Sequence, residues 1–117
     1  MSLTKFGNAL IDISEKLIDK LKNDPRCLKI DPPVYILGDL HGNFQDLISF
    51  ERILWHLSPT LSPCNLLFLG DFVDRGFHSV EVVSYLFAYK FQNYEKMHLL
   101  RGNHEVRDIQ RMFSFYG

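Results

Sequence analysis

Three short motifs that combine glycine with oxygen- or imidazole-bearing side chains recur along this 117-residue chain. They are residues 38–42 (GDLHG), 70–76 (GDFVDRG) and 102–105 (GNHE). The second residues of these motifs are Asp39, Asp71 and Asn103, and each is separated from the next by 32 residues. A strand–helix–strand unit takes about thirty or more residues. The spacing therefore predicts that one oxygen ligand follows each of three consecutive strands.

These side chains are suited to metal-assisted phosphoryl chemistry. Carboxylate, amide and imidazole ligands favour Mn, Fe or Zn over metals that prefer thiolates. Asp71, on the middle strand, could bridge two ions about 3.5–4 Å apart. Arg75 offers a fork of donors that matches the oxygens of a phosphate. His104, oriented by a carboxylate such as Asp74, could protonate a departing alkoxide.

Each motif taken singly has a simpler interpretation. An Asp or Asn beside a glycine is a common turn former, and a single histidine is commonly a hydrogen-bonded structural residue. Three motifs in order, at equal spacing and on consecutive strand ends, favour the ligand interpretation instead.

The segments between the motifs predict the elements that position them. Apolar residues at helical spacing predict helices over residues 3–21, 47–57 and 80–91. Short apolar runs that stop at a glycine predict strands over residues 34–37, 66–69 and 97–100. A helix followed by β-α-β-α-β predicts an α/β fold with a parallel sheet. All three motifs then lie at the carboxyl edge, where open sheets bind ligands.

Composition excludes several other classes of protein. The net charge is -1, with 13 Lys plus Arg against 14 Asp plus Glu, so no overall charge favours nucleic acid or anionic membranes. No apolar run reaches the ~18 residues of a membrane span. Two cysteines, Cys27 and Cys64, are too few for a disulfide scaffold, and we expect both to be reduced. We therefore expect an intracellular protein, cytoplasmic or nuclear, that binds neither nucleic acid nor membrane.

In this order the three motifs resemble those of the metal-dependent serine/threonine phosphoprotein phosphatases, the group that includes protein phosphatases 1 and 2A and calcineurin. The resemblance runs over residues 34–117 and implies the N-terminal half of a calcineurin-like metallophosphoesterase domain, preceded by a helix and linker over residues 1–33. It implies hydrolysis of phosphoserine and phosphothreonine esters by a hydroxide that two divalent metal ions activate. Phosphoprotein substrates and regulatory subunits would be the partners.

The resemblance also implies metal ligands. Asp39, His41 and Asp71 would hold the first ion, and Asp71 would bridge to a second ion that Asn103 also binds. In the family the second ion takes two further histidines downstream, and no histidine follows His104 in this sequence. The second metal site is therefore expected to be incomplete in this chain.

Substrate binding and proton transfer are implied for the remaining motif residues. Arg75 and Asn103 would bind the phosphate, and His104 would act as the general acid, held by Asp74. Supporting structural roles fall to Arg101 and Glu105. Other residues are expected to lie outside the site: His56, His78 and His98 with no site role, and Trp55 and the phenylalanines in the core.

The family domain is roughly twice this length or more, so we expect a C-terminally truncated domain with uncovered apolar surface. Two alternatives to the phosphatase interpretation follow. One is a catalytically incomplete fragment that binds a metal ion or a partner. The other is a hydrolase of the diadenosine tetraphosphatase kind, which shares the metal-binding scheme but acts on a dinucleotide.

Overall fold

The computed structural model describes residues 2–113 and residue 115. Contacts divide the chain into two compact units, Met1–Ile30 and Asp31–Gly117. One cysteine belongs to each unit, and both are free thiols, with Cys27 exposed and Cys64 buried. Among the described residues no helix is long and apolar enough to cross a membrane.

The first unit is built around α1, Leu3–Leu21, which has the bounds that the sequence predicts. Its amino end is capped by Ser2, whose hydroxyl accepts a hydrogen bond from the Lys5 backbone N–H at 3.4 Å. Such a cap satisfies one of the backbone donors that the first turn leaves free. On the surface of the helix, Lys16 and Asp12 form an i,i+4 ion pair at 2.7 Å.

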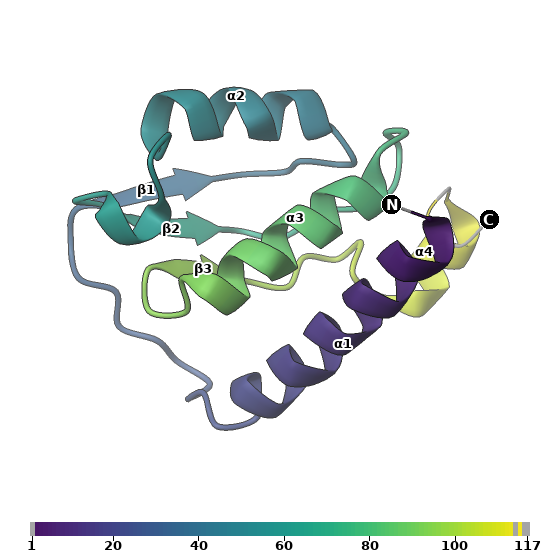
Figure 1. Ribbon diagram of the computed structural model, residues 1–117, viewed down its shortest axis with the longest axis horizontal. Coiled ribbons are helices and arrows are strands. Elements are labelled where there is room, and N and C mark those ends of the chain that lie inside the picture. The colour runs from purple at the N-terminus through teal and green to yellow at the C-terminus, as the bar shows by residue number, and fades with distance from the viewer. Residues whose placement is uncertain (1, 114, 116–117) are drawn as a thin grey trace. The chain divides into compact units, whose positions relative to one another are not determined.

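The second unit contains a three-stranded parallel sheet (Figure 1). The strands are β1 (Val34–Leu37), β2 (Asn65–Phe68) and β3 (Met97–Leu99), hydrogen-bonded in the order β1-β2-β3. The predicted topology is therefore confirmed, and each strand begins and ends within one residue of its predicted bounds. The middle position of β2 places the second motif between the other two.

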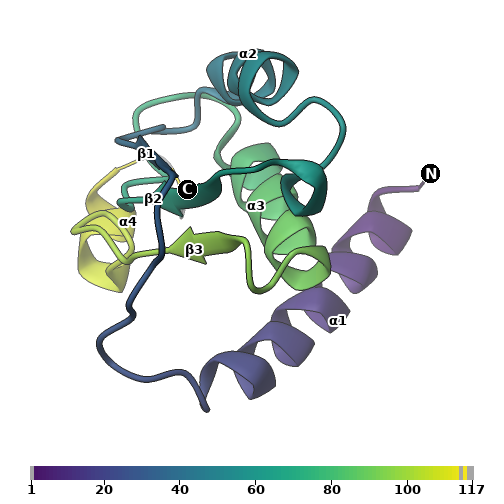
Figure 2. The ribbon, with the colours of Figure 1, turned by 90° about the vertical axis from the view of Figure 1, so that its left-hand side faces the viewer.

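Helices connect the strands and follow the last of them. α2 (Phe44–Leu54) joins β1 to β2, α3 (Ser79–Gln92) joins β2 to β3, and α4 (Arg107–Met112) follows β3. α2 and α3 lie on the same face of the sheet (Figure 2), as right-handed crossovers between neighbouring parallel strands require.

The second helix ends three residues before its predicted end at residue 57. Trp55 leaves the helical conformation, with φ -145° and ψ 40°, while its N–H still bonds the Glu51 carbonyl. The turn lets the indole pack edge-on against Phe68, with the ring centroids 6.1 Å apart. Burial of Trp55 to 2% exposure therefore ends the helix, and Leu57 stays outside it and exposed.

The core lies between the sheet and the two connecting helices. Successive side chains of a strand point to opposite faces of the sheet. On the helix-covered face, the observed register places the side chains of neighbouring strands beside one another. The buried core cluster consists of Leu37, Leu40, Leu47, Trp55, Leu66, Phe68, Phe72, Val73, Val82, Leu86 and Met97. On the other face of β1, Ile36 remains 64% exposed.

The expectation that the phenylalanines form the core is only partly correct. Phe68 and Phe72 are buried, but Phe50, Phe77 and Phe113 are exposed. Phe77 is the extreme case at 96% exposure, because it lies in the loop between β2 and α3, beyond the reach of the sheet and its covering helices.

Candidate functional site

The loops that follow β1 and β2 are joined directly through their backbones. The carbonyl of Asp71 accepts hydrogen bonds from the N–H groups of Leu40 at 3.1 Å and His41 at 2.9 Å. The next pair along, the N–H of Gly42 and the carbonyl of Phe72, are 2.9 Å apart. These bonds extend the pairing of β1 with β2 beyond the strand ends and fix the first motif against the second.

Glu105 joins the third loop to the second. Its carboxylate accepts hydrogen bonds from the backbone N–H groups of Asp71, Phe72 and Gly102, each at 2.8 Å. Arg101 in turn donates from Nε to the Glu105 carbonyl at 3.2 Å. The supporting role that the sequence predicts for Glu105 thus has a specific form, since one carboxylate satisfies three loop donors.

The loop backbones adopt an unusual conformation at the motif residues. All the non-glycine residues with positive φ in the described part of the chain lie in the first two motifs: His41 (43°), Asp71 (53°), Asp74 (68°) and Arg75 (66°). Such conformations cost of order 1–3 kcal/mol each and cluster at functional sites. Surrounding hydrogen bonds hold them in place here, which indicates that the side chains are held in set directions.

Two glycines allow the loops to approach one another closely. A Cβ atom at Gly102 would overlap the backbone nitrogen and carboxylate of Asp71, and one at Gly76 would overlap the carbonyl oxygen of His41. These positions admit only glycine because a neighbouring loop occupies the space that a side chain needs.

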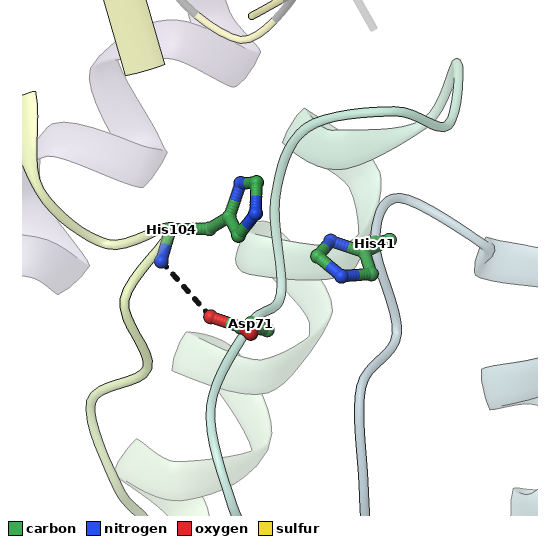
Figure 3. Close-up of side chains that lie close together, drawn as sticks. All are labelled: His41, Asp71 and His104. Atoms are coloured by element: carbon green, nitrogen blue, oxygen red, sulfur yellow. Dashed lines mark hydrogen bonds between the residues drawn. The ribbon is translucent and has the colours of Figure 1, made fainter. Parts of the chain in front are cut away.

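Three side chains from the three motifs come together at this edge (Figure 3). His41, Asp71 and His104 each offer a ligand atom, and these atoms all lie within 4.8 Å of one another. The backbone N–H of His104 donates to Asp71 Oδ1 at 2.9 Å, and the two imidazole rings meet edge to face with centroids 4.7 Å apart. The expected meeting of the motifs is therefore present.

His41 could serve as a metal ligand, because one ring nitrogen contacts the backbone and the other is free. Its Nδ1 lies 2.9 Å from the carbonyl oxygen of Val73. Because a carbonyl only accepts hydrogen bonds, Nδ1 carries the proton in the neutral ring, and Nε2 keeps a free lone pair. Asp39 lies on the Nε2 side, with its carboxylate oxygen 3.6 Å away and its side chain 65% exposed. These nitrogen and oxygen donors fit a divalent ion such as Mn, Fe or Zn.

His104 is held by Asp74 in the interior of the protein. Its Nδ1 is 3.0 Å from Asp74 Oδ2, with the histidine side chain 4% exposed and the aspartate fully buried. The other carboxylate oxygen of Asp74 accepts a hydrogen bond from the Phe115 N–H at 3.0 Å. Both oxygens of this buried carboxylate are thus satisfied, and the imidazole is fixed with Nε2 as its remaining ring nitrogen. The sequence predicts this contact.

Arg75 and Asn103, like Asp39, are exposed members of the predicted set. Arg75 lines a pocket of about 420 Å³ together with His41 and His78. Asn103 lies between Gly102 and His104, both of which contact Asp71. The sequence does not reveal the Val73 carbonyl that orients His41, because a backbone partner has no residue-type signal.

The chain is similar to known proteins over most of its length. Residues 32–117 match the family described as Calcineurin-like phosphoesterase. Over 106 residues the chain is 41% identical to a protein phosphatase 2A catalytic subunit of Dictyostelium discoideum, covering 91% of this chain and 33% of that protein. Over 101 residues it is 41% identical to the PP2A-like serine/threonine-protein phosphatase PPG1 of Saccharomyces cerevisiae, covering 86% and 26%.

A solved structure shows the same fold. It is that of a protein serine/threonine phosphatase from Saccharomyces cerevisiae with similarity to human phosphatase PP5, and it superposes with a TM-score of 0.79 at 26% sequence identity. The match covers 92% of this chain and 35% of that one. This chain thus spans about a third or less of the proteins it resembles.

Proposed function

This chain belongs to the calcineurin-like phosphoesterase family, and on that premise we propose that its site takes part in the metal-dependent hydrolysis of phosphoserine and phosphothreonine esters in proteins. The named relatives are serine/threonine protein phosphatases, which supports this substrate class. The buried His104–Asp74 pair is the main structural support, because it places an oriented imidazole beside the candidate metal ligands.

Metal binding would involve Asp39, His41 and Asp71, with Asp71 shared with a second ion at Asn103. The free Nε2 of His41 and the neighbouring carboxylates supply the donors. Bound divalent ions, with manganese, iron or zinc as the proposed metals, would lower the pKa of a water molecule and offset charge on the phosphate.

The remaining residues act on the substrate. Arg75 would bind the phosphate oxygens through its guanidinium group, and the strained backbone at this residue fixes where the side chain begins. His104 would donate a proton from Nε2 to the departing alkoxide. Asp74 would stabilise the charged imidazolium and keep its ring in one orientation.

The first experiment is hydrolysis of an aryl phosphate by the purified 117-residue chain while manganese is added. Activity should rise with manganese, disappear with a chelator and be absent from His41→Ala. His41→Ala loses a ligand nitrogen from a side chain that is 17% exposed. Equal rates of hydrolysis in the wild-type chain and in His41→Ala would show that the proposed site does not carry out the reaction.

The same preparation separates the two alternatives. A count of tightly bound ions per folded chain distinguishes a two-metal site from an incomplete fragment, which would hold one ion or none. Faster turnover of a diadenosine tetraphosphate than of a phosphopeptide would indicate that the substrate is a dinucleotide and not a phosphoprotein.

Partners and location complete the proposal. We infer an intracellular site of action, cytoplasmic or nuclear, because phosphoproteins are the proposed substrates and both cysteines are free thiols. Regulatory subunits are proposed as further partners on the basis of family resemblance. Co-purification of the tagged chain from cytosolic and nuclear extracts would test both points.

A further inference from the structure

An exposed aromatic side chain borders the pocket that contains Arg75. Phe77 is 96% exposed and lines this pocket with His41 and Arg75. A phenylalanine ring buries about 150–250 Å² when it is covered, so Phe77 offers a large apolar contact that the described fold leaves unused. The other polar residues lining the pocket are neutral or basic, and none of the described lining residues is acidic.

The backbone on both sides of Phe77 is held firmly. The N–H of Gly76 lies 2.9 Å from the His41 carbonyl and 2.8 Å from the Asp74 carbonyl. On the other side, the N–H of His78 donates to the Gly42 carbonyl at 3.2 Å, and the His78 carbonyl accepts the first bond of α3, from Val82. Phe77 is therefore presented from a fixed backbone and next to the first motif.

Phe77 is two residues from Arg75 along the chain, and both residues line the same pocket. Two residues span at most about 7 Å, and neighbouring Cα atoms are about 3.8 Å apart. Because both side chains line one pocket of about 420 Å³, a phosphate bound by Arg75 would leave the neighbouring side chain of a substrate close to the Phe77 ring. None of the described residues that line the pocket carries a negative charge that would repel the phosphate.

We propose that Phe77 is a specificity-determining residue that contacts an apolar side chain adjacent to the phosphorylated residue of the substrate. This inference rests on the proposed function, because it assumes a phosphorylated peptide at Arg75. The preferred substrates are then phosphoserine and phosphothreonine sequences flanked by leucine or a similar apolar residue, rather than by glycine.

The test is a binding measurement that does not depend on turnover. Two fluorescent peptides carry a non-hydrolysable phosphonate in place of phosphothreonine, one flanked by leucine and the other by glycine. Their affinities for the full chain are measured by anisotropy with manganese present. We expect the leucine peptide to bind about five- to tenfold more tightly, the effect of burying most of one apolar side chain.

Variants assign this preference to Phe77. Phe77→Ala should bring the two affinities within about twofold, and Phe77→Leu should restore most of the difference, since leucine keeps an apolar contact. Ile53→Ala is the matched control, because Ile53 is also highly exposed, at 75%, but lies on α2. Circular dichroism would verify that each variant is folded.

The outcomes separate this inference from the proposed function. The role of Phe77 is overturned if the preference for leucine persists in Phe77→Ala. It is also overturned if the wild-type chain does not bind the leucine peptide, or binds it no more tightly than the glycine peptide. Hydrolysis of aryl phosphate by the wild-type chain, with His41→Ala inactive, would in those cases still support the proposed function. A Phe77-dependent preference without any hydrolysis would support the binding contact and count against catalysis by this chain.

Discussion

Two regions of the second unit are stabilised by different interactions. One is the carboxyl edge of the sheet, and the other is the covered layer, where α2 and α3 pack on one face of the sheet. At the edge, buried polar groups and backbone hydrogen bonds hold four non-glycine residues at positive φ. In the helix-covered layer, regular helices pack apolar and aromatic side chains against the strands.

The covered layer also contains polar groups, and three of its aromatic side chains are hydrogen-bonded. Trp55 Nε1 donates to the Tyr85 hydroxyl at 3.1 Å, and the Tyr89 hydroxyl donates to Glu51 Oε1 at 2.6 Å. The two tyrosine rings stack with centroids 4.2 Å apart. Each ring contributes apolar area as well as one hydrogen bond.

Because the two regions are held by different interactions, stability and function can be changed separately. Removing apolar volume from the covered layer should weaken the fold, because packing is the main favourable contribution there. Changing a polar group at the edge should alter the direction of a functional side chain. Substitutions in the two regions should therefore separate loss of activity from loss of stability.

His104→Asn should lower the rate of phosphate-ester hydrolysis by about 10²–10⁴-fold, the usual contribution of general acid catalysis. Asparagine keeps a donor that can reach the buried Asp74 carboxylate, so the variant should fold and bind manganese as the wild type does. Steady-state kinetics and metal analysis on the same sample measure both properties. Full activity in this variant would exclude His104 as the proton donor.

Phe68→Ala should lower the free energy of unfolding by about 3–5 kcal/mol, because the ring is fully buried on the central strand. Urea denaturation of the variant beside the wild type measures the loss. Ile53→Ala serves as the control and should cost less than about 1 kcal/mol, since its side chain is 75% exposed. Similar losses in the two variants would contradict the assignment of the core.

Glu105→Gln should lower the free energy of unfolding by about 2–3 kcal/mol. The amide presents a donor where the carboxylate accepts, so at least one of the three loop N–H groups loses its partner. The matched variant is Glu81→Gln, on the exposed start of α3, where about 0.5 kcal/mol or less is expected. If both substitutions have the same small effect, Glu105 does not hold the loops together.

The smallest effect is a pH dependence of the free energy of unfolding that the tyrosines of the covered layer cause. Burial raises the pKa of Tyr85 and of Tyr89 above the ordinary value of 10.0, and donation to Glu51 raises the pKa of Tyr89 further. Above pH 10 the unfolded chain releases these protons first, so the free energy of unfolding should fall as the pH rises.

Tyr89→Phe should cost about 1 kcal/mol at neutral pH through loss of its hydrogen bond. The variant Tyr85→Phe/Tyr89→Phe should show a shallower decline than the wild type between about pH 9 and pH 11. Urea denaturation across this range measures the slope. An unchanged slope would show that other groups cause the alkaline loss of stability.

Much of the fold could be predicted from local patterns. Apolar periodicity located α1 at its observed bounds and the three strands within one residue, because these elements depend on neighbours along the chain. The end of α2 could not be predicted, because the rotation of Trp55 out of the helix depends on a contact with Phe68 from another strand.

The candidate site shows the same division. The equal spacing of Asp39, Asp71 and Asn103 predicted that the motifs share one edge. The pairing of His104 with Asp74 also followed from the motifs, and the 3.0 Å contact confirms it. The exposure of Phe77 was not predictable, because composition assigns phenylalanine to the core, and only its position beyond the sheet places it at the surface.

Residue type and spacing were enough to predict the order of the elements, the parallel sheet and the chemical types of the site residues. The direction of each functional side chain depends instead on contacts between distant parts of the chain. The Val73 carbonyl selects the exposed nitrogen of His41, and Glu105 collects donors from two loops. The contact of His41 with Val73 joins residues 32 positions apart, and that of Glu105 with Asp71 joins residues 34 positions apart. Their geometry exists only when the three strand ends are brought together.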